Sequence, residues 1–230
     1  VGTLNRPISP RRRLGYLTRP VEDLLRIRTS HGVKLNDVVL AAAASGVRRF
    51  MADRGEAPVA VKAMVPVNVR SGRDEDALGN RISFMFVDLP CDEPDPVRRV
   101  RTIHGETNER KRRGFPQGGD DVIGALGLAP GPLQRLASRL IASPRTFNLV
   151  VSNIPGPRED AYMCGCRLRE TYPVVPLSDR HTLSIGFTSV GDRGCFGLYA
   201  DRDSLPDVDD LADCIDAAID ELLDPVERAV

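Results

Sequence analysis

The stretch between Phe147 and Pro157 constrains the fold more than any other part of this sequence. An apolar run of strand length leads into Ser152 and Asn153, and Pro155 then fixes its own φ and pushes the preceding residue into an extended conformation. This pattern predicts a buried strand that ends in a rigid turn. A small polar pair at such a strand end is suited to lining a cleft, and equally to capping its own turn.

Hydrophobic periodicity in the rest of the chain predicts a mixture of helices and strands. Strands are predicted over residues 59–70, 82–89, 167–175, 182–190 and 195–200. Helices are predicted over residues 21–28, 35–53, 96–113 and 133–141, and from residue 207 to a stop at Pro225. The last two strands flank a Gly-rich tetrapeptide, which is typical of a hairpin. The mixture predicts an α/β domain with a mixed sheet flanked by helices.

The sequence divides into three segments. Residues 1–20 carry too few apolar side chains to pack and are predicted to be a linker or arm, residues 21–224 form the folded lobe, and residues 225–230 follow the last helix as a tail. With 230 residues, the chain is long enough for a sizeable core. Because it opens on Val1 rather than methionine, we expect a trimmed product or a piece of a longer protein.

Charge and cysteine content exclude several classes of function. Lys+Arg and Asp+Glu are 32 each, so no bulk positive field recruits nucleic acid. The five cysteines are odd in number and far apart except for Cys164 and Cys166, which indicates a reducing compartment. Without a second ligand pair, Cys-x-Cys predicts ordinary thiols and no metal site. No apolar run reaches the roughly 18 residues of a membrane span, and we expect a cytoplasmic protein.

No complete catalytic constellation stands out in the sequence. His31, His104 and His181 are scattered, each in a setting typical of a structural or surface histidine, and no Ser or Cys occupies a nucleophile elbow. Asn36 and Asp37 stand where a helix starts, and two interpretations remain open. In one, Asn36 caps free amides while Asp37 complements the helix dipole; in the other, the pair orients a residue contributed from elsewhere in the chain, and both can hold together.

Five short motifs lie in order between about residue 20 and residue 223. They are Leu-Asn-Asp-Val-Val-Leu-Ala-Ala at 35–42, Val-Pro-Val-Asn-Val-Arg at 65–70, Leu-Gly-Asn at 78–80 with Ser83, Ser-Asn-Ile-Pro-Gly-Pro at 152–157, and the segment 198–206. Together they resemble the C-terminal half of the bacterial wax ester synthase/diacylglycerol acyltransferase family. The Asn-Asp and Ser-Asn-x-Pro-Gly-Pro motifs are the most specific of the five.

The resemblance implies a chloramphenicol acetyltransferase-like architecture, shared with condensation domains, in which two lobes enclose a tunnel. In the family, a His-His-x-x-x-Asp-Gly motif on the N-terminal lobe supplies the general base that deprotonates an alcohol for attack on an acyl-CoA thioester. This sequence has no His-His pair, so the resemblance implies that the N-terminal lobe is its partner and that this segment alone is inactive. Acyl-CoA is then a substrate, and no cofactor or metal is implied.

The same resemblance implies which residues serve the reaction. Asn36 and Asp37 are expected to support the active site without transferring protons. Contacts to substrate are expected from Asn80, Ser152 and Asn153, and an anion contact from Arg70. The acceptor is expected to be diacylglycerol or a long-chain alcohol, which makes triacylglycerol or wax ester the product.

Alternatives to this function remain open at the level of the sequence. The chain is alternatively a non-catalytic module of the same fold that binds a lipid or a partner, or a condensation-type acyltransferase. For the acyl-CoA enzyme, we expect attachment to the inner membrane face or to lipid inclusions in addition to the cytoplasm.

Overall fold

A computed structural model describes residues 2–68, 82–112, 143–157 and 159–227. A six-stranded mixed sheet in the order β1-β8-β7-β4-β2-β3 forms the centre of this part of the chain. Its strands are β1 (Arg12–Pro20), β2 (Val61–Asn68), β3 (Ile82–Leu89), β4 (Leu149–Asn153), β7 (Leu183–Val190) and β8 (Arg193–Asp201). Strand β4 runs parallel to β2 and β7, and the pairs β1–β8, β7–β8 and β2–β3 are antiparallel. The predicted α/β fold with a mixed sheet is therefore confirmed.

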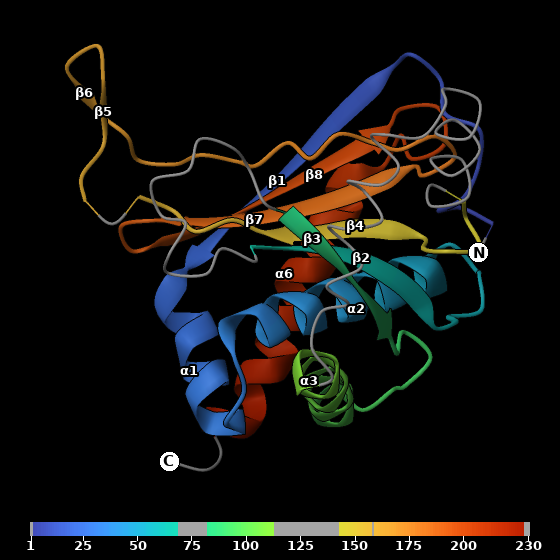
Figure 1. The fold of residues 1–230 in the computed structure, drawn as a ribbon, viewed down its shortest axis with the longest axis horizontal. Coiled ribbons are helices and arrows are strands. Elements are labelled where there is room, and N and C mark those ends of the chain that lie inside the picture. The colour runs from blue at the N-terminus through green and yellow to red at the C-terminus, as the bar shows by residue number, and fades with distance from the viewer. Residues whose placement is uncertain (1, 69–81, 113–142, 158, 228–230) are drawn as a thin grey trace.

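Four helices of the described residues cover one face of the sheet (Figure 1). They are α1 (Val21–His31), α2 (Leu35–Asp53), α3 (Pro96–Arg112) and α6 (Val208–Glu227). Alternate strand residues, such as Val61, Ala63 and Val65 of β2, join these helices in one buried core. The alanine-rich α2 is buried on more than one side, since residues 37–47 are all buried and the helix packs against α1, α3 and α6.

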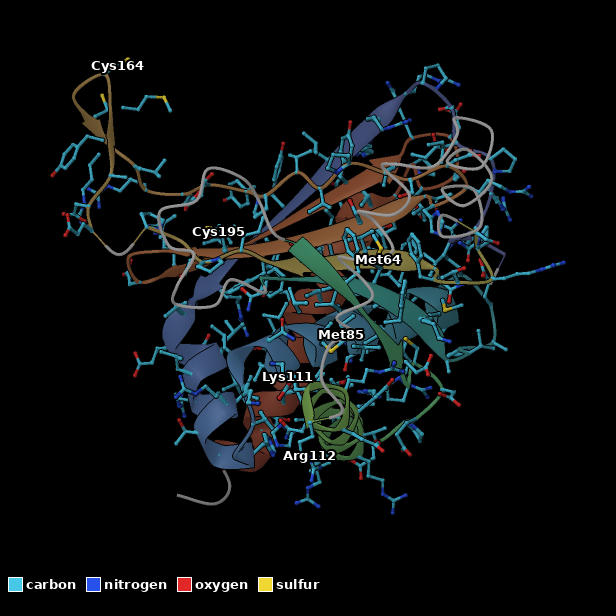
Figure 2. All side chains as sticks on the ribbon, in the orientation of Figure 1. Met64, Met85, Lys111, Arg112, Cys164 and Cys195 are labelled. Carbon is cyan, nitrogen blue, oxygen red and sulfur yellow. The ribbon has the colours of Figure 1, made fainter. Side chains whose placement is uncertain are left out.

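The opposite face of the sheet, which we call the open face, is covered by fewer described residues. Met64 points to this face and Met85 points to the helix layer (Figure 2). Three large apolar side chains on the open face are partly exposed, with exposed fractions of 36% for Leu14, 51% for Tyr16 and 36% for Phe84. Accessible apolar surface on the open face thus lies on its edge strands β1 and β3, whereas Val150 and Ser152 of β4 are buried.

A short hairpin stands apart from the main sheet. It consists of β5 (Tyr162–Met163) and β6 (Cys166–Arg167), which pair only with each other. Figure 1 shows it projecting from the body of the domain, and Figure 2 shows Cys164 at its tip. The predicted strand over residues 167–175 is wrong, because residues 168–175 form no strand.

Residues 168–175 instead cross the open face of the sheet. Pro173 lies against Gly186 and Gly197, which face each other in the register of β7 and β8. A Cβ atom at either glycine would come within 2.6 Å and 2.3 Å of Pro173 atoms, respectively, so only glycine permits this approach. The chain therefore passes over the sheet rather than adding to its edge.

The prediction of a linker over residues 1–20 is wrong for residues 12–20, which form the edge strand β1. This strand needs few apolar side chains because its backbone pairs with β8 and its arginines pair with α6. Arg13 binds Asp209 at 2.5 Å, and Arg19 binds Asp216 at 3.2 Å as well as Asp220. Charged side chains are a common way to protect an edge strand from unwanted pairing.

Other element boundaries differ less from the predictions. The β7–β8 hairpin is confirmed, with a tighter turn at Gly191 and Asp192 than the predicted tetrapeptide. Helix α6 continues to Glu227 through the predicted stop at Pro225, because losing one amide in the last turn does not end a helix. The predicted helix over residues 133–141 lies outside the described residues.

Candidate functional site

The fold brings the start of α2 and the end of β4 to the same end of the domain. The short connection over residues 54–60 returns the chain from the end of α2 to the start of β2, so α2 runs opposite to β2 and to its parallel neighbour β4. The first turn of α2, with Asn36 and Asp37, therefore lies at the end where Ser152 and Asn153 finish β4 (Figure 1). In α/β sheets this is the end where ligands commonly bind.

Asp37 is fully buried and holds together two elements of this end. Its Oδ1 accepts a hydrogen bond from Thr107 Oγ1 of α3 at 2.8 Å. Its Oδ2 accepts from the backbone N–H of Lys34 at 3.1 Å and lies 2.7 Å from Nδ1 of His104, also on α3. A buried carboxylate is tolerated only when it is paired in this way. Asp37 thus orients residues contributed from α3.

His104 continues the hydrogen-bonded chain toward the surface. Its side chain is 28% exposed, and its Nε2 lies 2.7 Å from the amide nitrogen of Asn108, which is 3.4 Å from Nδ1. The amide oxygen of Asn108 accepts from Nζ of Lys34 at 2.8 Å. Sequence reasoning treated His104 as structural and missed this role. The signal that could have revealed it is the spacing of His104, Thr107 and Asn108, which places all three on neighbouring positions of one helix.

Asn36 does not cap the helix as one of the two sequence interpretations held. Helix α2 starts at Leu35, Lys34 is its N-cap residue, and Asp37 at the third position accepts the Lys34 backbone N–H. The half-buried side chain of Asn36 makes no hydrogen bond within the described residues. Its amide is therefore open to a ligand or to a residue outside them.

Ser152 and Asn153 point to opposite faces of the sheet, because successive strand residues alternate. Ser152 shares the open face with Val150 and is 7% exposed, whereas Asn153 shares the helix-side face with Val151 and is half-buried. Neither side chain makes a hydrogen bond within the described residues. Two further candidates, Arg70 and Asn80, lie outside the described residues.

His181 and the buried cysteines Cys91 and Cys214 have structural roles. His181 is fully buried, and its Nδ1 and Nε2 face the backbone oxygens of Asp179 at 2.7 Å and Phe147 at 3.1 Å. Carbonyl oxygens only accept hydrogen bonds, so His181 is not placed to take a proton from a substrate. Burial raises the pKa of Cys91 to about 12 and of Cys214 to about 11, which keeps both thiols protonated and poorly nucleophilic.

The described residues lack two features. They contain no group of three or more His, Cys, Asp or Glu side chains arranged to hold a metal ion. None of their helices combines the length and the apolar character that crossing a membrane requires.

Comparison with known families decides which family this chain represents. The model of the WS/DGAT C-terminal domain, named for wax ester synthase and diacylglycerol acyltransferase, matches residues 78–223. The chain belongs to this family. The matched WS/DGAT segment includes β3, α3 with His104, β4 with Ser152 and Asn153, and most of α6.

Curated relatives of this WS/DGAT domain include mycobacterial proteins. A probable diacylglycerol O-acyltransferase of Mycobacterium tuberculosis is 32% identical over 225 residues, which cover 96% of this chain and 49% of the relative. A putative diacylglycerol O-acyltransferase of the same species is 34% identical over 226 residues, or 95% of this chain and 45% of the relative. The chain thus spans about half the length of the curated relatives that it matches.

Solved structures agree with the family assignment. The wax ester synthase/diacylglycerol acyltransferase from Marinobacter aquaeolei VT8 superposes with a TM-score of 0.78 at 28% identity, covering 98% of this chain and 52% of that one. A condensation domain of the enacyloxin polyketide synthase superposes with a TM-score of 0.62 at 12% identity, covering 96% of this chain and 42% of that one. The second similarity shows a shared fold, which is the fold expected from the sequence motifs.

Proposed function

We propose that this chain is the C-terminal lobe of an acyl-CoA-dependent O-acyltransferase that makes triacylglycerol or wax ester. The observation that carries the proposal is the WS/DGAT domain match over residues 78–223, supported by relatives that are named diacylglycerol O-acyltransferases. In the proposed reaction, the oxygen of diacylglycerol or of a long-chain alcohol attacks the thioester carbonyl of acyl-CoA. The carbon–sulfur bond breaks, CoA leaves as the thiol, and the proton of the alcohol passes through a general base.

The base of this reaction is proposed to come from an N-terminal lobe. Among the described histidines, His181 faces backbone oxygens and His104 is engaged by Asp37 and Asn108. The sequence contains no His-His pair, and the chain spans about half of its relatives. We propose that this N-terminal lobe docks on the open face of the sheet, where Leu14, Tyr16 and Phe84 present apolar surface.

The proposed roles within this lobe follow from where each residue lies. Asn36, whose amide has no partner among the described residues, and Ser152, on the open face, are proposed to contact substrate, together with Asn153 and Asn80, and Arg70 is proposed to bind an anion. Asp37 is proposed to support the site from its buried position. No metal and no cofactor is part of the proposal. Since acceptor and product are lipids, we expect the enzyme to work at the inner membrane face or at lipid inclusions.

Thiol release from acyl-CoA tests this proposal. Intact-mass analysis first establishes which polypeptides the purified sample contains. Palmitoyl-CoA is then supplied with a diacylglycerol or with hexadecanol, and free CoA is measured with a thiol reagent. We expect turnover when the chain is joined to an N-terminal lobe that carries the His-His motif, and none from the 230-residue chain alone. Turnover by the chain alone would place the base within this sequence.

A further inference from the structure

We infer that Asp37 is a positioning residue that acts through His104. The Asn36–Asp37 pair then serves acyl transfer in two ways: Asn36 contacts the ligand, and Asp37 fixes a histidine ring on the neighbouring helix. This inference rests on the proposed function for its reaction and on the hydrogen bonds around Asp37 for its geometry.

The burial of Asp37 separates it from any ligand. Its side chain has no exposed surface, and its two oxygens already accept from Thr107, from the Lys34 backbone and from His104. These donors come from two elements, the start of α2 and the middle of α3. A substrate could reach the carboxylate only if the two helices separated. Any effect of Asp37 on a reaction is therefore passed on by the groups that it holds.

Lys34 determines the direction of each hydrogen bond in the series that runs through Asn108 and His104 to Asp37. Its ammonium group only donates, so the Asn108 amide oxygen faces Lys34 and the amide nitrogen faces His104. An amide nitrogen also only donates, so Nε2 of His104 accepts. The ring proton then lies on Nδ1, which donates to Asp37. This series of hydrogen bonds thus selects the neutral Nδ1–H tautomer of His104.

The selected tautomer gives His104 a defined chemical character. A carboxylate that accepts from one imidazole nitrogen fixes the ring and makes the other nitrogen a better acceptor. That other nitrogen, Nε2, faces the amide of Asn108, and the His104 side chain as a whole is 28% exposed. When Asn108 turns away, Nε2 accepts from a ligand hydroxyl or amide N–H. Replacing Asp37 removes the restraint on the ring while leaving the ring itself in place.

Nitrogen NMR of the histidine side chains tests the tautomer directly. The 230-residue chain has only three histidines, so the spectrum of His104→Gln assigns the His104 signals by their loss. Near neutral pH we expect a protonated Nδ1 and an unprotonated Nε2 in the wild type. In Asp37→Asn we expect loss of this tautomer preference. An Nε2–H tautomer in the wild type, or an unchanged pattern in Asp37→Asn, would overturn the inference.

A double-mutant cycle tests whether the effect on acyl transfer passes through the ring. In the active two-lobe protein we expect Asp37→Asn and His104→Gln each to lower kcat/KM about tenfold, and the double variant to be no slower than either. Arg98→Ala, which alters an exposed residue of the same helix, is the matched control and should stay within about twofold. Multiplied losses of about a hundredfold would show that Asp37 acts independently of His104.

The two experiments separate the inference from the proposed function. If the wild-type two-lobe protein transfers no acyl group, the proposed function fails and the role of Asp37 in acyl transfer fails with it. An Nδ1–H signal would still establish that Asp37 fixes the ring. Thermal unfolding of each variant accompanies the cycle, and a loss of kcat/KM that tracks the loss of folded protein would overturn the positioning role.

Discussion

His104 lies beside the first turn of α2 and His181 beside the start of β4, and the two are bound in opposite ways. His181 is fully buried, stacks on Phe147 with ring centroids 4.0 Å apart, and has only backbone oxygens at its nitrogens. His104 is 28% exposed and meets a side chain at each nitrogen, Asp37 on one and Asn108 on the other. Backbone partners cannot rotate away, whereas the Asn108 side chain can.

The difference separates an end of the domain built for stability from an end suited to binding. Around His181, Asn148 bonds the Lys62 backbone N–H at 2.7 Å, and Asp201 bonds Ser9 and Ser204. Every one of these groups is satisfied within the fold. At the other end, the side chains of Asn36, Ser152 and Asn153 have no hydrogen-bond partner among the described residues. Unsatisfied polar groups near a strand end are where a ligand gains most from binding.

The largest effect should come from removing the ring of His181. We expect His181→Ala to lower the free energy of unfolding by about 3 kcal/mol, because it leaves a cavity against Phe147 and removes the hydrogen bond that the imidazole donates to a backbone oxygen. His104→Gln removes the other imidazole ring and should cost about 1 kcal/mol. Urea denaturation of both variants measures the two values. A larger loss of unfolding free energy in His104→Gln than in His181→Ala would contradict the difference between the two histidines.

An effect of intermediate size is expected at Asp201, beside His181 in the fold. Burial raises the pKa of this carboxyl, but hydrogen bonds from Ser9 and Ser204 outweigh it and hold the pKa below its usual range. A lowered folded-state pKa gives stability that is present above the unfolded pKa of about 3.9 and is lost as pH falls through the folded value.

Asp201→Asn should therefore cost about 2 kcal/mol of unfolding free energy at pH 7, and the difference from the wild type should shrink below about pH 4. Chemical denaturation at several pH values measures both quantities. A difference that stays constant from pH 7 to pH 3 would mean that the carboxylate charge at this end does not matter.

We expect the smallest effect on stability from Asn36→Ala. The same variant should lower the activity of the two-lobe protein. Because Asn36 makes no hydrogen bond within the described residues, its loss should change the unfolding free energy by less than about 0.5 kcal/mol. In the two-lobe protein we expect kcat/KM to fall about tenfold, which corresponds to about 1.4 kcal/mol. Thiol-release kinetics and urea denaturation of the same sample check both parts. A stability loss that equals the activity loss would assign Asn36 to the fold.

Local pattern was sufficient to predict the elements whose apolar side chains face one core. Helix α2, strand β4 and the β7–β8 hairpin were predicted because their periodicity and their turn residues agree with their tertiary environment. Strand β1 was missed because the partners of its arginines are on α6, far away in the sequence. Residues 168–175 were predicted as a strand because local pattern does not reveal that Pro173 fills a gap between two glycines.

Only part of the candidate site could be predicted from the sequence. Asn36 and Asp37 were noticed through their place at a helix start, and orientation of a distant residue was one of the two interpretations. The identity of that residue, His104, could not be predicted, because a hydrogen bond between α2 and α3 depends on how the two helices cross. The family assignment and the expectation of acyl transfer were inferred from the motifs rather than from the chemistry of single residues.

The pairing of β1 with β8 sets the order in which this domain can assemble. Arg12 lies opposite Asp201 and Pro20 opposite Arg193, so the edge of the sheet joins segments from far apart in the chain. Closing so long a loop costs conformational entropy before any contact compensates for it, and folding slows as contacts become less local. During synthesis on the ribosome, residues 12–20 must wait until the β7–β8 hairpin has emerged. Completion of this sheet edge is therefore expected to be a late step.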